Sequence, residues 1–179
     1  MVEYTGEKIS FRQLSDEDLV LTHKWLLAPH VKEWYGQGKQ TFEDIKKKYT
    51  PRIKNEDPTS CFIMLYDGKP IGQIQMYKIS DYPEYEKIIQ PIKKAAGIDL
   101  FIGERDYQNK GLGSIIIKKF LKDFVFVKLD VDTCVIGPNP QNIAAIKAYQ
   151  KAGFTYTKTV VNHDGEEEYL MELQKNFQE

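Results

Sequence analysis

The sequence contains few of the features that mark metal-binding, secreted or membrane proteins. Its two cysteines, Cys61 and Cys134, lie in separate apolar runs and form no CxxC pair. This argues against a cysteine zinc site and favours buried, reduced thiols. No apolar run approaches the ~20 residues of a membrane span, and Met1–Thr5 has neither the basic nor the apolar region of a secretory leader. We therefore expect a cytoplasmic protein with no metal site and no membrane contact.

The sequence also lacks an excess of charge of one sign. Its 25 Lys and Arg residues nearly balance 26 Asp and Glu residues, which gives a formal net charge of -1. A protein that grips a phosphate backbone needs a clear cationic excess, so we expect no nucleic-acid partner. The length of 179 residues and the 41% hydrophobic content suit one globular domain, 1–179. The oligomeric state, monomer or dimer, is left open by the sequence.

Hydrophobic periodicity divides the chain into short strands and helices. Strands are predicted over 8–14, 60–66, 70–79, 96–102, 133–136, 155–161 and 167–173. Helices are predicted over 19–27, 41–49, 111–124 and 141–152. Thr50–Pro51 is expected to end the second helix, and residues 81–95 are ambiguous, an acidic loop followed by a short helix. The mixed order predicts an α/β domain.

The segment with the most chemical information stands between a predicted strand and a predicted helix. We call it the glycine turn, and it reads Gln108-Asn109-Lys110-Gly111-Leu112-Gly113. Its glycines let the backbone approach a ligand and adopt conformations that side chains forbid. N–H groups at a helix N-terminus favour an anion, and Lys110 adds a cation. The turn therefore suits a phosphate or pyrophosphate, although a glycine-rich turn that merely starts a helix fits the pattern equally well.

A second pattern follows in the last predicted helix, with Asn142, Ala145, Tyr149, Gly153 and Phe154 at the spacing NxxAxxxYxxxGF. Together with QxxGxG in the glycine turn, it resembles the GNAT acetyltransferase superfamily. The resemblance implies a GNAT-like acyl-CoA N-acyltransferase fold, a mixed α/β sheet whose fourth and fifth strands splay apart around acetyl-CoA. The pyrophosphate would lie on the glycine turn and the pantetheine arm along the fourth strand. The implied cofactor-binding residues are Leu100, Phe101, Ile102, Gln108, Asn109, Lys110, Gly111, Leu112, Gly113, Ser114, Asn142, Ala145 and Tyr149.

A closer resemblance, from Ile9 to Leu173, is to the aminoglycoside 6'-N-acetyltransferases. It rests on the pieces 25–26, 31–36, 70–72, 97–99 and 145–149, with Gln75 and Tyr77. It implies a small, cationic amine as substrate and a link to antibiotic resistance. Two positions depart from the family pattern. Leu100 stands where members often have Gln, and Gly137 where they often have Asp, so polar contacts expected near the acceptor or cofactor are missing.

Asp99 is the only acid in an otherwise apolar predicted strand. A buried, unpaired carboxylate is costly, so Asp99 should face a cavity, a partner or solvent. As a catalytic group it would bind a primary ammonium and accept its proton during attack on the thioester, directly or through water. The alternative is an aspartate on the solvent face of an edge strand.

Tyr149 lies where the family pattern places the group that protonates the departing thiolate, and the alternative for it is a packed helical aromatic. Asn142 should contact the pantetheine arm, cap its helix, or do both. A backbone N–H near Leu100 or Phe101 would meet the oxyanion. The sequence shows no Ser-His-Asp or Cys-His pattern, which favours direct transfer in a ternary complex.

The acceptor side is expected to combine aromatic rings with acids, a combination that suits a polycationic sugar. Its predicted residues are Trp34, Tyr35, Gln75, Tyr77, Glu84 and Asp99, with the acidic segment 81–86. A further acidic cluster, Asp164 and Glu166 to Glu168, is interpreted as solvated surface. The alternative is that it extends the acidic acceptor side.

The leading hypothesis is acetyl-CoA-dependent 6'-N-acetylation of an aminoglycoside-like amino sugar. Two alternatives stay open. One is a GNAT enzyme that acts on another amine, such as a hydroxylated-lysine siderophore precursor or a protein amine. The other is a non-catalytic sensor that binds coenzyme A.

Overall fold

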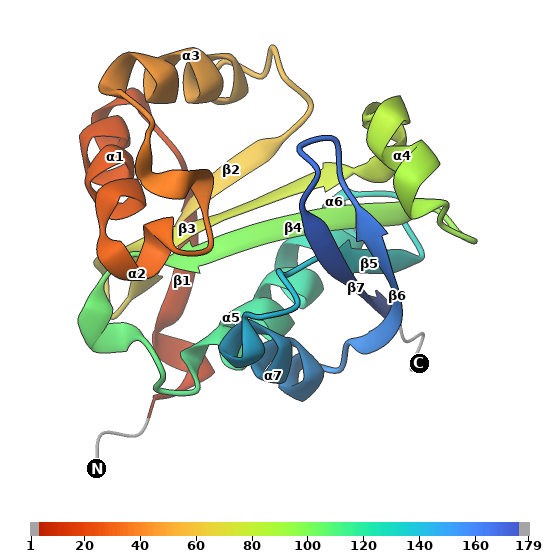
Figure 1. Ribbon diagram of the computed structural model, residues 1–179. Coiled ribbons are helices and arrows are strands. Elements are labelled where there is room, and N and C mark those ends of the chain that lie inside the picture. The colour runs from red at the N-terminus through yellow and green to blue at the C-terminus, as the bar shows by residue number, and fades with distance from the viewer. Residues whose placement is uncertain (1–3, 176–179) are drawn as a thin grey trace. The chain divides into compact units, whose positions relative to one another are not determined.

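The computed structural model describes residues 4–175, and its strands form one seven-stranded mixed sheet (Figure 1). The strand order is β1-β2-β3-β4-β5-β7-β6. The strands are β1 (Ile9–Gln13), β2 (Ser60–Tyr66), β3 (Lys69–Lys78), β4 (Ala95–Ile102), β5 (Thr133–Ile136), β6 (Thr155–Val161) and β7 (Glu167–Gln174). β4 and β5 run parallel, whereas β1 with β2, β5 with β7, and β6 with β7 are antiparallel. The predicted mixed α/β fold class is confirmed.

The helices are short and mostly lie between strands in the sequence. The α-helices are α1 (Leu19–Leu27), α2 (Pro29–Lys32), α3 (Phe42–Ile53), α4 (Pro83–Ile89), α5 (Leu112–Phe120), α6 (Phe126–Lys128) and α7 (Ile143–Ala152). The tighter 3-10 turns are η1 (Gly6–Lys8), η2 (Asp16–Asp18), η3 (Gly36–Gly38), η4 (Ile79–Asp81) and η5 (Arg105–Tyr107), and η6 (Leu121–Val125) is a π-helical turn. In the part of the chain that the structure describes, no helix is both long and apolar enough to cross a membrane.

The chain divides into two compact units, and β3 and β4 each pass from one unit into the other. Within the described residues, unit 1 comprises 4–75 and 99–112, and unit 2 comprises 76–98 and 113–175. The expectation of one domain, 1–179, stays a prediction. Each unit has its own buried core.

The core of unit 1 lies where α2 and α3 each pack against α1, and α3 packs against β2 (Figure 1). Trp25 of α1 is almost fully buried, and its indole N–H donates to Glu104 at 2.9 Å. A buried indole needs such a partner because an unpaired donor is costly. The core residues are Leu14, Leu19, Trp25, Leu26, Val31, Ile45, Tyr49, Cys61, Ile63 and Phe101.

Gly72 of β3 sits against the neighbouring backbone. A Cβ added at Gly72 would overlap the carbonyl oxygen of Phe101 in β4. Because backbone yields less than a flexible side chain, we expect Gly72→Ala to lower the free energy of unfolding by about 1–3 kcal/mol or more. Gly113→Ala is the control: its Cβ would lie 3.4 Å from that of Ala148, so unfolding should change by less than about 1 kcal/mol. Urea unfolding measures both, and equal losses would contradict the packing argument.

Helix α3 continues past the point where the sequence predicted its end. The helix runs to Ile53 with Pro51 inside it, so the prediction that Thr50–Pro51 ends it was wrong. Proline removes one backbone donor, but here only one further turn follows. The carbonyls of Thr50 and Pro51 accept from the N–H groups of Lys54 and Glu56 at 3.1 and 2.8 Å. The extra turn carries Arg52, which lies in the candidate site.

Unit 2 packs the short helix α4 beside the β6–β7 hairpin (Figure 1). Its core contains Ile79, Ile89, Ala95, Val135 and Leu170. The acidic loop expected in 81–95 is instead the end of η4 and the first turn of α4, which begins at Pro83 because its fixed φ suits a first helical position. Gln90 ends α4 in a left-handed conformation, φ 49°.

The helix predicted over 111–124 is only partly α-helical. Helix α5 ends at Phe120 and is followed by the π-helical turn η6. The wider turn keeps Leu121 and Val125 buried, with Phe120 stacked on Phe124 at 5.2 Å. A π turn leaves the hydrophobic spacing close to helical, so the sequence pattern does not reveal it.

Candidate functional site

Asp99 lies half-buried in β4 and has a partner on the neighbouring strand. The Gln75 amide Nε2 donates to Asp99 Oδ2 at 2.8 Å. Gln75, in β3, is 7% exposed, so this hydrogen bond is shielded from water. Because β4 stands between β3 and β5 in the sheet, the alternative of an aspartate on an edge strand was wrong. Of the three surroundings expected for Asp99, a cavity, a partner or solvent, the structure shows a partner, Gln75.

Arg52 holds the other end of the Gln75 amide. Its Nη1 donates to Gln75 Oε1 at 2.9 Å, and its Nε lies 3.5 Å from Asp57 Oδ1. The Arg52 side chain is 13% exposed and its guanidinium carbon lies 5.6 Å from the Tyr49 ring centre. Sequence reasoning missed Arg52 because it placed the end of α3 before Pro51. The available signal was the position of Pro51 near the end of the predicted helix, where a proline can be followed by a short final stretch of helix.

Two tyrosines stand close to this acid. The Tyr35 ring lies 5.1 Å from that of Phe101. Burial raises the pKa of Tyr35 well above its ordinary value, and the negative charge of Asp99 raises it further. Burial also raises the pKa of Tyr49 in α3. Both phenols therefore stay neutral at physiological pH. Of the two neighbouring aromatic residues predicted on the acceptor side, Tyr35 is partly buried against the core of unit 1 and Trp34 is 40% exposed.

The glycine turn has the backbone that its sequence predicts. Asn109 and Gly111 adopt left-handed conformations, with φ 53° and 76°, and α5 begins directly afterwards at Leu112. Asn109, Lys110 and Gly111 are exposed. A left-handed residue immediately before a helix directs successive N–H groups outward, the geometry of an anion-binding nest. The assignment of the turn to a pyrophosphate stays a prediction.

In unit 2, the start of α5 lies close to the middle of α7, because a Cβ at Gly113 would touch that of Ala148 at 3.4 Å. Asn142 Oδ1 accepts from the Ala145 N–H at 3.1 Å, so the capping interpretation of Asn142 is confirmed. Tyr149 is 9% exposed and its ring lies 6.4 Å from that of Phe154. The roles predicted for Gly113, Ser114, Ala145 and Tyr149 toward a cofactor stay predictions.

The acceptor residues predicted in unit 2 have separate surroundings. The Tyr77 ring covers Gly97, whose added Cβ would lie 2.5 Å from it, and it meets the Tyr82 ring edge-on at 5.2 Å. Glu84 is exposed and pairs with Lys87 at 2.8 Å. An exposed pair of this kind contributes little to stability.

Glu168 is anchored, so its interpretation as solvated surface was wrong. The Tyr85 hydroxyl donates to Glu168 Oε2 at 2.7 Å, and Asn162 Nδ2 donates to Glu168 Oε1 at 3.0 Å. A Cβ added at Gly137 would lie 2.7 Å from Glu168 Oε2. A carboxylate therefore stands beside Gly137, although it is carried by β7 and not by residue 137 itself.

The predicted site residues are divided between the two units. Unit 1 holds Trp34, Tyr35, Gln75, Leu100, Phe101, Ile102, the turn 108–112 and Asp99, and unit 2 holds Tyr77, Glu84, Gly113, Ser114, Asn142, Ala145 and Tyr149. The pairing of β4 with β5 runs from Ala95↔Thr133 to Gly97↔Val135. Asp99 and the rest of β4 continue beyond the last of these pairs.

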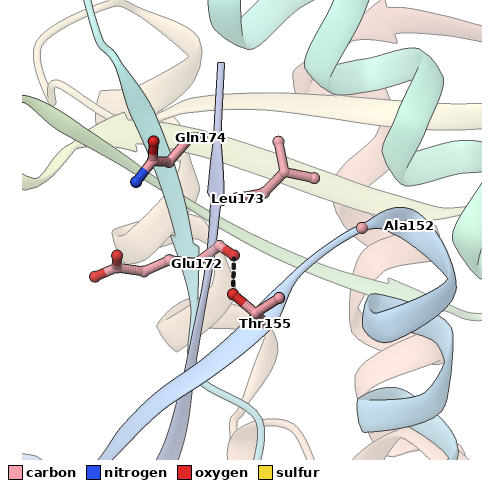
Figure 2. A pocket seen from close by; sticks show the side chains of 6 residues that line it. Ala152, Thr155, Glu172, Leu173 and Gln174 are labelled. Carbon is pink, nitrogen blue, oxygen red and sulfur yellow. Dashed lines mark hydrogen bonds between the residues drawn. The ribbon is translucent and has the colours of Figure 1, made fainter. Parts of the chain in front are cut away.

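A shallow hollow of about 300 Å³ lies at the end of α7 (Figure 2). Thr155 Oγ1 donates weakly to the Glu172 carbonyl there, at 3.5 Å. None of the predicted site residues lines this hollow, so we do not place the functional site there. The hollow is lined by Ala152, Gly153, Thr155, Glu172, Leu173 and Gln174. Within residues 4–175 no group of three or more His, Cys, Asp or Glu side chains is arranged to hold a metal ion.

Comparison with known proteins agrees with the motifs. The chain is 27% identical to the aminoglycoside N(6')-acetyltransferase type 1 of Klebsiella pneumoniae, over 99% of this chain and 89% of that protein. It is 32% identical to a kanamycin resistance protein of Rhizobium radiobacter, over 46% of this chain and 75% of that one.

Solved structures of aminoglycoside acetyltransferases are also similar to this chain. The fold is similar to that of AAC(6')-Ib in complex with paromomycin and acetyl-CoA, with a TM-score of 0.84, 27% identity and 94% of each chain covered. It is also similar to AAC(6')-Ib in complex with coenzyme A and kanamycin, with a TM-score of 0.82, 27% identity, and 93% and 95% of the two chains covered. Residues 15–161 match the acetyltransferase (GNAT) domain family. Because that match spans most of the sequence, the chain belongs to the GNAT acetyltransferase family.

Proposed function

We propose that the chain is an acetyl-CoA-dependent N-acetyltransferase whose acceptor is the 6'-amine of an aminoglycoside-like amino sugar. The observation that carries this proposal is the carboxylate of Asp99, half-buried on β4 and held by Gln75 at 2.8 Å. It lies on the part of β4 that runs beyond the last pair with β5. The names of the relatives and the ligands in their structures support the choice of donor and acceptor.

The chain's own groups suit coenzyme A. The left-handed residues Asn109 and Gly111, directly before α5, suit a pyrophosphate. The backbone of β4 from Leu100 to Ile102 continues past its pairing with β5 and suits an extended amide-containing arm. Asn142 would add a polar contact at the start of α7. Bound acetyl-CoA supplies the thioester that is attacked.

The catalytic residues act on the proton and on the developing charges. Asp99 binds the acceptor ammonium and accepts its proton, directly or through water, as the amine nitrogen attacks. A backbone N–H near Leu100 or Phe101 donates to the oxyanion. Tyr149 gives its hydroxyl proton to the sulfur as the carbon–sulfur bond breaks, and the second proton of the acceptor nitrogen returns to the phenolate through water. We expect direct transfer because the sequence shows no Ser-His-Asp or Cys-His pattern. Burial also raises the pKa of Cys61 to about 11, which makes this thiol a poor nucleophile.

The first test is thiol release from acetyl-CoA with kanamycin or tobramycin, with spermidine as a control amine. We expect saturable release with the aminoglycosides and much weaker release with spermidine. Thermal stabilisation by acetyl-CoA without thiol release would favour the alternative of a non-catalytic sensor that binds coenzyme A. Release with spermidine or lysine but with no aminoglycoside would remove the acceptor half of the proposal.

Glu168 supports a cationic acceptor, because it places an anchored carboxylate beside Gly137. We expect Glu168→Gln to raise KM for kanamycin about tenfold with little change in kcat, since one charge-assisted hydrogen bond is worth about 1.5–3 kcal/mol. The neighbouring exposed acid gives a matched control, Glu167→Gln. Steady-state kinetics at low salt compares the two variants, and equal KM values in both would show that Glu168 does not contact the acceptor.

A second candidate acceptor is an amine that carries its own anionic group, such as a hydroxylated lysine. It is favoured by Lys48 of α3, a cation close enough to Asp99 for the two charges to interact. Desolvation lowers the pKa of Lys48, the positive charge of Arg52 lowers it further, and the charge of Asp99 opposes both effects. Competition between kanamycin and N6-hydroxylysine in the thiol-release assay decides between the two acceptors.

A further inference from the structure

The Gln75 amide can point either way in principle, and Arg52 on one side and ionised Asp99 on the other require the same orientation. A guanidinium can only donate hydrogen bonds. The contact of 2.9 Å between Arg52 Nη1 and Gln75 therefore requires the amide oxygen on that side. The amide nitrogen must then face Asp99, where it donates to Oδ2 at 2.8 Å. Cys61 also lies on the oxygen side, with Sγ 3.6 Å from Gln75 Oε1.

Arg52 is itself held by a chain of contacts that starts at the backbone. The Thr59 N–H donates to Asp57 Oδ1 at 2.8 Å, and the same oxygen lies 3.5 Å from Arg52 Nε. The planar guanidinium can meet Asp57 and Gln75 through different nitrogens, which the ammonium of a lysine cannot do in the same geometry. All members of the series Thr59, Asp57, Arg52, Gln75 and Asp99 belong to unit 1.

We propose that Arg52 is a positioning residue for Asp99 and that it acts through Gln75 without contacting the acceptor. It fixes the amide so that an N–H, and never the carbonyl oxygen, faces the carboxylate. It also polarises that amide, because hydrogen bonds in a chain strengthen one another. Both effects favour the ionised form of Asp99 and hold one of its oxygens in place. The proposal rests on the role of Asp99 in the proposed function.

Arg52→Met is the direct test. We expect kcat/KM for kanamycin to fall about tenfold, mostly through kcat, since the lost contact is charge-assisted. The acidic limb of the pH profile for kcat/KM should move to higher pH, because loss of the cation and of the fixed N–H favours the protonated acid. For Arg52→Lys, both kcat/KM and the position of the acidic limb should lie between those of the unmodified protein and those of Arg52→Met. Arg12→Met is the control, because it removes another arginine of unit 1 from a bidentate pair with Asp18 and should leave the pH profile unchanged.

A double-mutant cycle separates action through Gln75 from other effects of Arg52. Gln75→Met removes the relay, so adding Arg52→Met to it should lower kcat/KM by less than about twofold. Fully additive losses, or an unshifted acidic limb in Arg52→Met, would overturn the proposal.

A readout that needs no catalysis keeps this test independent of the proposed function. The side-chain amide of Gln75 should give shifted, slowly exchanging NMR signals in the unmodified protein, and Arg52→Met should lose that protection while Arg12→Met keeps it. If the unmodified protein does not acetylate kanamycin, the proposed function fails and the amide signals still test the relay. If it does acetylate kanamycin and the amide signals are the same in Arg52→Met, only the relay fails.

Discussion

Asp99→Asn is expected to lower kcat/KM for kanamycin by about 10²- to 10⁴-fold, the usual contribution of a general base. Asparagine has nearly the same shape, and its oxygen can still accept the 2.8 Å hydrogen bond from Gln75. The substitution therefore removes the negative charge that binds the ammonium and the basic oxygen that accepts its proton, with little disturbance of β4. Thiol release under saturating acetyl-CoA gives kcat and KM for the acceptor.

Two controls isolate the chemical role of Asp99. Asp106→Asn removes an exposed acid of the same unit, in η5, and should behave like the unmodified protein. Thermal stabilisation by coenzyme A should be equal in Asp99→Asn and the unmodified protein, because the glycine turn is untouched. Activity of Asp99→Asn within tenfold of the unmodified protein would assign Asp99 a structural role and move the search for the base elsewhere.

Strand positions could be predicted well from the sequence because local signals bound them. β2 and β5 have the bounds that periodicity predicts, and the Asp67–Gly68 turn between β2 and β3 has both residues at positive φ, 50° and 76°. Such turns depend on a few adjacent residues. Helix ends were predicted less well. α3 passes through Pro51 to Ile53, and α5 gives way to a π turn in which Leu121 stays buried.

The candidate site could be predicted only where a residue contrasts with its neighbours along the chain. Asp99 stands out as an acid in an apolar strand, and the glycine turn stands out by its spacing. Local contrast does not mark the residues that hold Asp99: Gln75 was predicted through the family resemblance, and Arg52 was missed. Gln75 meets Asp99, and Arg52 meets Gln75, only because α3, β3 and β4 come together in unit 1. Such contacts depend on register and packing, which a single sequence does not encode locally.

Position 137, where family members often have Asp and this chain has Gly, also shows that contacts between distant segments are not visible in a local motif. The departure of Gly137 from the family pattern suggested a lost polar contact. In the structure the carboxylate of Glu168 occupies the space next to Gly137, and Tyr85 and Asn162 hold it there. The absence of a Cβ at residue 137 makes room for an acid from β7. A substitution in a motif can therefore be compensated from a strand that the motif does not include.

Tyr149→Phe is expected to lower kcat about 100-fold, near the lower end for a general acid. A thiolate can leave without being protonated, so loss of the general acid should lower kcat less than loss of the general base does. Phenylalanine keeps the ring, which is 9% exposed and 6.4 Å from that of Phe154. Thermal stability should therefore change little, and KM for kanamycin should stay the same. Single-turnover measurement of acetyl transfer separates this step from product release.

The alternative for Tyr149 is a packed aromatic whose hydroxyl has no chemical role, and the same variant decides between the two. If packing were its only role, Tyr149→Phe would keep its kcat. Tyr156→Phe is the matched control, because it removes a hydroxyl from a half-exposed ring of the same unit, in β6. A loss of kcat in Tyr149→Phe alone, at unchanged stability, would assign the Tyr149 hydroxyl to the departing sulfur. Equal kcat in both variants would leave protonation of the thiolate to solvent.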